Sequence, residues 1–144
     1  MNCNNRENQD EGLIGNERIE EAIAALQNDA TQEQLAHTLT VIRRRMKEGG
    51  QVIVAVEMVP GSAQMNLKTV QTEDGHIWWY AFTSFEEELK GGDDVKSTFL
   101  AEIGKLFEMA LSVPEIEGII INPWNKTIQL DKNLIRIIMP ETRK

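Results

Sequence analysis

The chain has 144 residues, of which 15 are Lys or Arg and 23 are Asp or Glu, and its formal net charge is −8. This length suits one domain with its own hydrophobic core, and the negative charge disfavours nucleic acid and anionic membranes as partners, because both bind through clustered positive charge. The single cysteine, Cys3, excludes an internal disulfide and any site of several cysteine ligands, which fits a reducing cytoplasm.

The first 15 residues are mostly polar, and we expect them to form a disordered leader before one domain over residues 16–144. They contain no apolar stretch of the kind found in a secretory signal. No later apolar run approaches the roughly 20 residues that a membrane span requires. The sequence therefore predicts a cytoplasmic protein with no membrane partner.

Two helical patterns follow the leader. The first begins after Asn16, a favourable N-cap, and its apolar residues recur at spacings of three and four: Ile19, Ala22, Ile23 and Leu26. The second begins at Thr31, which forms a capping-box pattern with Gln34, and it ends at Gly49-Gly50. Together they predict an N-terminal helical hairpin.

Strand patterns then take over. Residues 52–56 are a continuous apolar run, typical of a strand buried on both faces, and residues 65–72 alternate as a half-exposed strand does. Asp74-Gly75 predicts a two-residue turn into a third strand over residues 76–83. Because this third strand carries large apolar side chains on both faces, we expect it to be central.

The last third of the chain predicts a crossover and a hairpin. Residues 85–89 predict a helical turn, and residues 95–111 predict a long helix with one apolar stripe: Val95, Phe99, Ile103, Leu106 and Ala110. Strands over 118–121 and 127–130 are joined by a short loop, and Asp131 caps a short C-terminal helix. The order predicts an α+β fold with a mixed five-stranded sheet and a long crossover helix between strands three and four.

Two motifs in this part of the chain carry a family resemblance. The first is the segment 79–84, Trp-Tyr-Ala-Phe-Thr-Ser, and the second is 117–123, Glu-Gly-Ile-Ile-Ile-Asn-Pro, with the long helix between them. Over about residues 52–140 the chain resembles the N-terminal domain of the SseB family. The resemblance implies a bacterial cytoplasmic protein of poorly defined function, with no catalytic residues to carry over. Larger members of the family have a further C-terminal domain, for which we expect no room here.

The sequence lacks the linear patterns of the common catalytic, nucleotide and zinc sites, so we expect no catalytic residues, no cofactor and no metal site. One enzyme hypothesis stays open, in which Glu57 meets His76 or His37 only in the folded state. The favoured interpretation of Glu57 is simpler: it marks the point where its strand reaches solvent.

The loop around Trp124 is the leading candidate for a binding surface. An indole in such a turn either folds back on the core, which is the favoured interpretation, or faces a partner as an interface hot spot. We therefore predict a non-enzymatic binding or protein-interaction module whose partner is another protein, with a surface formed by Asn122, Trp124, Asn125 and Trp78. The alternative is a homodimer that buries the aromatic sheet face.

A weaker candidate is the basic cluster Arg43, Arg44 and Arg45, which would contact an anion or an acidic protein. The cluster lies at the end of the second helix, where the helix dipole alone stabilises cations. Successive helical positions point about 100° apart, so the three side chains cannot all grip one phosphate.

Overall fold

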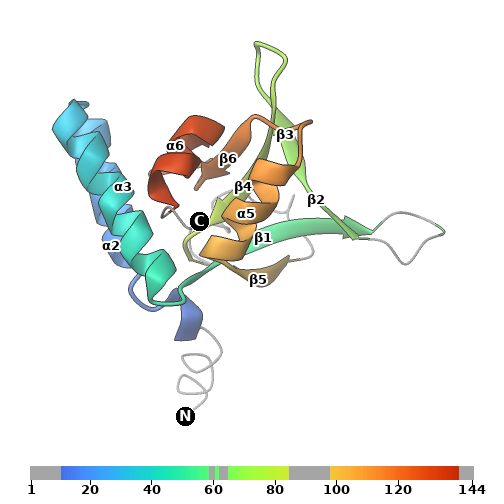
Figure 1. Cartoon of the computed structure of the whole chain (residues 1–144), viewed down its shortest axis with the longest axis horizontal. Coiled ribbons are helices and arrows are strands. Elements are labelled where there is room, and N and C mark those ends of the chain that lie inside the picture. Colours follow the sequence, from blue (N-terminus) through green and yellow to red (C-terminus); the bar gives the residue numbers. More distant parts are fainter. Residues whose placement is uncertain (1–10, 59–60, 62–64, 85–97, 140–144) are drawn as a thin grey trace.

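A computed structural model describes residues 11–58, 61, 65–84 and 98–139, and the helices and strands below refer to these residues. The helices are η1 (Glu11–Leu13, a 3-10 turn), α2 (Glu17–Asn28), α3 (Gln32–Lys47), α5 (Ile103–Ser112) and α6 (Lys132–Ile138). The strands are β1 (Gln51–Met58), β2 (Met65–Leu67), β3 (Thr69–Gln71), β4 (Ile77–Phe82), β5 (Thr98–Glu102), β6 (Gly118–Ile121) and β7 (Ile128–Asp131). Figure 1 shows α5 and α6 over the strands, with the α2–α3 pair beside them.

These strands form one mixed sheet. β1 is antiparallel to β5 along one edge and to β4 along the other, β4 is parallel to β6, and β6 is antiparallel to β7. Gly118 is required where β6 meets β7, because a Cβ atom there would lie 2.0 Å from the backbone oxygen of Leu130. The topology confirms the α+β class, the central third strand and the C-terminal hairpin.

The prediction of five strands is wrong, first because residues 65–72 form two strands instead of one. β1 and β4 pair only at Ile53 and Val54, and beyond these residues they diverge. The segment between them fills the widening gap: β2 pairs with the end of β1, the Lys68 amide bonds to the Ala55 oxygen, and β3 pairs with the start of β4. The chain changes partner at Lys68, so the ladder is split.

The second correction concerns the long helix predicted for residues 95–111. Residues 98–102 are strand β5, paired with β1 from Ala55↔Thr98 to Gln51↔Glu102, and only Ile103–Ser112 is helical. Without β5, the backbone N–H and C=O groups along this edge of β1 would have no hydrogen-bond partners. Pairing at five positions stabilises the strand more than the helical spacing of a few apolar residues stabilises a helix. The start of the predicted helix and the predicted turn at 85–89 lie outside the described residues.

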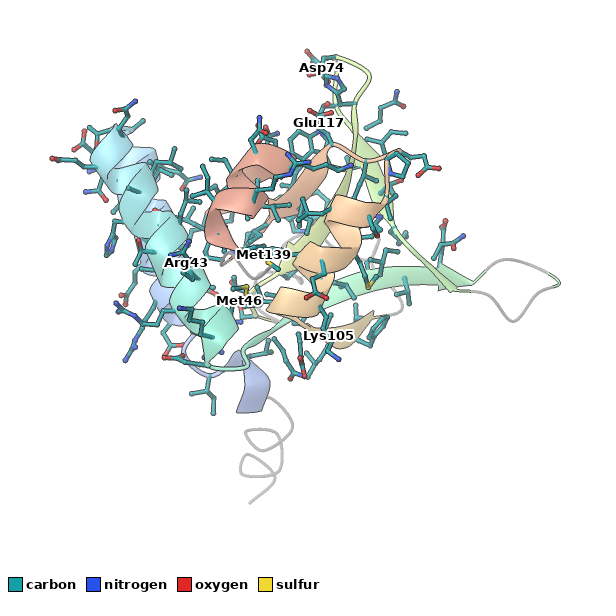
Figure 2. The ribbon with its side chains drawn as sticks, viewed as in Figure 1. Arg43, Met46, Asp74, Lys105, Glu117 and Met139 are labelled. Atoms are coloured by element: carbon teal, nitrogen blue, oxygen red, sulfur yellow. The ribbon has the colours of Figure 1, made fainter. Side chains whose placement is uncertain are left out.

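The main core lies between the helices and one face of the sheet. The strands supply alternate residues to it, including Val52, Val54, Trp79, Ala81 and Ile119, and the described helices α2, α3, α5 and α6 pack their apolar faces there. Met46 and Met139, labelled in Figure 2, pack at its margin. The opposite face of the sheet carries a smaller cluster around Ile53 and Phe82.

The N-terminal part of the chain differs from the prediction at two points. Leu13 is buried against Ile53 and Phe82, so residues from Glu11 onward pack on the domain although they were expected to belong to the leader. Asn16 is 1% exposed and its side chain makes no cap hydrogen bond to α2. The predicted caps at Thr31 and Asp131 are confirmed by hydrogen bonds from the amides of Gln34 and Leu134.

Candidate functional site

The Trp124 loop starts from a buried asparagine at the end of β6. Asn122 is fully buried with φ at 55°, a left-handed conformation that asparagine tolerates better than most residues. Its Oδ1 accepts a hydrogen bond from the Thr83 amide at 2.9 Å, and its Nδ2 donates to the Thr83 hydroxyl at 3.0 Å. The Thr83 hydroxyl in turn donates to Glu20 of α2. The ends of the parallel strands β4 and β6 are therefore fastened to each other and to α2.

The rest of the loop closes back on Asn122. Its backbone oxygen accepts hydrogen bonds from the Thr127 hydroxyl and from the Asn125 amide. Lys126 has φ at 44°, which reverses the chain into β7. Because these bonds fix both ends of a short turn, the position of Trp124 between them is fixed as well.

The Trp124 side chain lies partly on the protein and partly in solvent. Its ring centroid is 6.4 Å from those of Tyr80 and Phe82, which lie on the sheet face opposite the helices, yet the residue is 44% exposed. The favoured sequence interpretation, an indole folded into the core, is therefore wrong. The structure shows an indole resting on an aromatic base with much of its surface open.

The other predicted surface residues are distributed differently. Asn125 is exposed, but Asn122 is buried, and Trp78 is only 7% exposed, with its Nε1 donating to the Thr72 hydroxyl at 3.4 Å. Tyr80, which is not among the predicted surface residues, is half-buried beside Trp124. It could have been found from the alternation of the strand, which puts Tyr80 on the same sheet face as Phe82.

Sequence reasoning also missed a buried polar junction. Arg45 is 6% exposed, and its Nε donates to Asn16 Oδ1 at 2.9 Å, its Nη2 to the Gly12 oxygen at 2.9 Å, and its Nη1 to Glu48 at 2.8 Å. Asn16 Nδ2 donates to the backbone oxygens of Gln51 and Thr83. This junction ties η1, α3, β1 and β4 together at the end of β4, next to Asn122, where the Trp124 loop begins.

The three arginines do point apart, as the helical geometry predicts. Arg45 turns inward to the junction just described, while Arg43 reaches the end of α6 (Figure 2), where its Nε donates to the Ile138 oxygen at 2.8 Å and its Nη2 to the Ile137 oxygen. Arg44 is exposed. The structure thus gives two of them structural partners and leaves Arg44 at the surface.

The histidines do not join Glu57. Glu57 is exposed opposite Asn66 in the β1–β2 ladder, and in the described part of the chain no hydrogen bond or ion pair links it to His37 or His76. His76 instead lies near the β3–β4 turn, with Nδ1 3.0 Å from Asp74 and Nε2 3.8 Å from Glu117. Both carboxylates are labelled in Figure 2. The groups of the open enzyme hypothesis are not brought together, and Glu57 marks the solvent end of its strand as expected.

This exposed cluster has shifted pKa values. Hydrogen bonds from Thr72 and then from His76 lower the pKa of Asp74 from 3.8 to about 2. The hydrogen bond to Asp74, followed by the charges of Asp74 and Glu117, raises the pKa of His76 above 6.5. The Asp74 contribution to stability is complete above pH 3.8 and is lost as the pH falls toward 2. The His76 contribution is complete below pH 6.5 and is lost as the pH rises through the raised pKa.

We expect Asp74→Asn to bring the pKa of His76 back toward its ordinary value, because this change removes both the charge and the stronger hydrogen-bond acceptor. An NMR titration of the His76 ring protons measures the shift. Glu117→Gln is the matched control and should have a smaller effect, since that carboxylate acts only through its charge from 3.8 Å. An unchanged His76 titration in Asp74→Asn would contradict the assignment.

Two features bear on the class of site. Within residues 11–58, 65–84 and 98–139, no group of three or more His, Cys, Asp or Glu side chains is placed to hold a metal ion. No helix of the described chain has the length and apolar character needed to cross a membrane.

Comparison with known proteins places the chain in a family. The family model for the SseB protein N-terminal domain matches residues 19–136, a range that includes the Thr83–Asn122 pair and the Trp124 loop. No curated protein and no solved structure shows a significant match. Since the family model spans most of the chain and agrees with the two motifs at the ends of β4 and β6, the chain belongs to the family of SseB protein N-terminal domains.

Proposed function

We propose that the domain is a protein-interaction module and that its contact is the Trp124 surface, formed by Trp124, Asn125 and the exposed part of Tyr80. The observation that carries this proposal is the 44% exposure of Trp124 on an aromatic base. Large aromatic side chains with polar neighbours are the residues that most often dominate binding at protein interfaces.

The fixed backbone of the loop supports the same function. Because the Asn122 oxygen holds both Thr127 and Asn125, little chain entropy has to be lost when a partner covers the indole. A preorganised indole binds more tightly than one on a loop that must first be ordered.

The polar groups beneath the surface are already satisfied. The side chains of Asn122 and Thr83 bond to each other, and Thr83 bonds to Glu20. The surface therefore offers shape, apolar area and an indole N–H, which suit recognition of a protein. We place this interaction in the cytoplasm of a bacterium, as the family resemblance implies.

We expect Trp124→Ala to lose the partners that the wild-type domain captures, with affinity lowered about 30-fold, since a hot-spot indole contributes about 2 kcal/mol. Affinity capture from lysate of the source organism, quantified by mass spectrometry, makes the comparison. Met109→Ala removes another exposed apolar side chain, 48% exposed on α5, and serves as the matched control.

Two outcomes would count against the proposal. An unchanged partner set for a folded Trp124→Ala protein would remove the surface from consideration. Sedimentation that shows a wild-type dimer and a monomeric Trp124→Ala variant would assign the surface to self-association instead.

A further inference from the structure

A second surface lies on the helical side of the sheet, away from Trp124. Residues of α3 and α6 line a hollow of about 390 Å³, with Leu35, Ala36 and Leu39 on one wall and Leu134 and Ile137 on the other. Ile137 is 55% exposed although it is a large apolar residue. The hollow is therefore an apolar groove between two helices.

The groove continues into a basic region. Thr40 and Arg43 line both this hollow and a second one of about 320 Å³, whose other residues are Arg44, Lys47 and Glu48. The carboxylate of Glu48 is already paired with Arg45. Among the residues that the structure describes, Arg44 and Lys47 form no ion pair, so the track is apolar at the start of α3 and positively charged at its end.

The shape of this track is stable because Arg43 joins its walls. The Arg43 guanidinium donates to the last carbonyl groups of α6, and these hydrogen bonds join α6 to α3. From Leu35 to Lys47 the track extends about 18 Å at 1.5 Å per helical residue. That length matches three to four turns of a docked helix.

We propose that this α3–α6 groove binds an amphipathic helix of a partner protein, with acidic residues in the first turn of that helix and apolar residues after it. The helix lies antiparallel to α3. In this direction its acidic first turn meets Arg44 and Lys47, its apolar residues enter the groove, and its positive dipole end adjoins the negative end of α3. A cationic end on a chain of net charge −8 selects an acidic ligand by charge complementarity.

Among the helices that the structure describes, none in a second folded copy is free to serve as this ligand. The described α-helices with acidic residues in the first turn are α2, with Glu17 and Glu20, and α3, with Glu33. The apolar residues of α2 are buried in the main core, where Ile19 and Ile23 are 0% exposed. α3 likewise has buried apolar residues in that core. Either helix could dock on another copy only by leaving its own core, so we assign the groove to a different protein.

The probe is a fluorescent, stapled helical peptide of roughly three to four turns, with Glu in the first turn and Leu at the i, i+3, i+4 and i+7 positions that follow. We expect it to bind the full chain in anisotropy titrations and to shift the amide NMR signals of α3 and α6. A second peptide, with Lys in place of each Glu, should bind about tenfold more weakly.

Variants of exposed residues test the charge and the groove separately. Arg44→Glu is expected to weaken the acidic peptide about tenfold, while Lys105→Glu on α5 makes the same charge change elsewhere and should leave the affinity within about twofold. Ile137→Asn should weaken the binding of both peptides.

Three results would overturn the proposal: equal affinity for the two peptides, an equal effect of Arg44→Glu and Lys105→Glu, or NMR shifts centred outside α3 and α6. A chain that dimerises in sedimentation, and whose dimer is dissociated by Ile137→Asn, would also overturn it. Because Trp124 is intact in all these variants, failure here is separate from failure of the Trp124 surface.

Discussion

Arg45→Ala is expected to lower the free energy of unfolding by about 3 kcal/mol, because it removes a buried donor from several acceptors. Asn16 Oδ1 and the Gly12 oxygen would lose the guanidinium N–H groups that they accept from, and neither lies fully in solvent. The fit around the guanidinium is close. A Cβ atom on Gly50 would lie 2.7 Å from Arg45 Nη2, so a residue larger than glycine at position 50 would clash with the guanidinium.

Urea unfolding followed by tryptophan fluorescence measures the change. The matched control is Arg44→Ala, the preceding residue on the same helix, which is exposed and should change stability by less than about 0.5 kcal/mol. If the two variants unfold at the same urea concentration, the Arg45 junction does not stabilise the fold and its assignment is wrong.

Asn122→Ala should cost about 3 kcal/mol as well, from two causes that can be separated. The buried Thr83 amide loses its acceptor, which costs about 1–3 kcal/mol. Alanine must also adopt a φ of 55°, which costs about 1 kcal/mol more than it does for asparagine. The same denaturation measurement gives the sum.

Asn122→Gly divides the two contributions, since glycine accepts the positive φ but cannot bond to Thr83. We expect it to be about 1 kcal/mol more stable than Asn122→Ala and clearly less stable than wild type. Equal stability of Asn122→Gly and wild type would show that the Thr83–Asn122 bonds contribute nothing.

Periodicity was sufficient for much of the fold and failed where partners far apart in the sequence decide the structure. The α2–α3 hairpin, the central strand β4 and the β6–β7 hairpin follow from local patterns, and the structure confirms them. β5 does not follow, because Thr98–Glu102 has the spacing of a helix face and is strand only since the β1 edge needs a partner. Likewise, nothing local to Lys68 shows that β1 and β4 diverge there.

The candidate site, too, could be predicted from the sequence only in part. The sequence selected Trp124 from its turn, but its exposure depends on Tyr80 and Phe82, which lie about 40 residues earlier in the chain. Thr83 and Asn122 belong to the two motifs of the family resemblance, but the sequence offered no physical explanation for their presence there. The structure explains it, because the two residues form hydrogen bonds to each other. The inward direction of the Arg45 side chain could not be predicted, because nothing in a run of three arginines indicates which one contacts Asn16.

The central claim, that the Trp124 surface contacts another protein, is tested most directly by a photoreactive amino acid. Benzoylphenylalanine is placed at position 125 of the full chain, beside the intact Trp124, and, as control, at position 109, and cells of the source organism are irradiated. We predict a covalent adduct at 125 that is heavier than the chain, that excess wild-type protein suppresses, and that is missing at 109. No adduct at 125, or the same adducts at both positions, would contradict the claim.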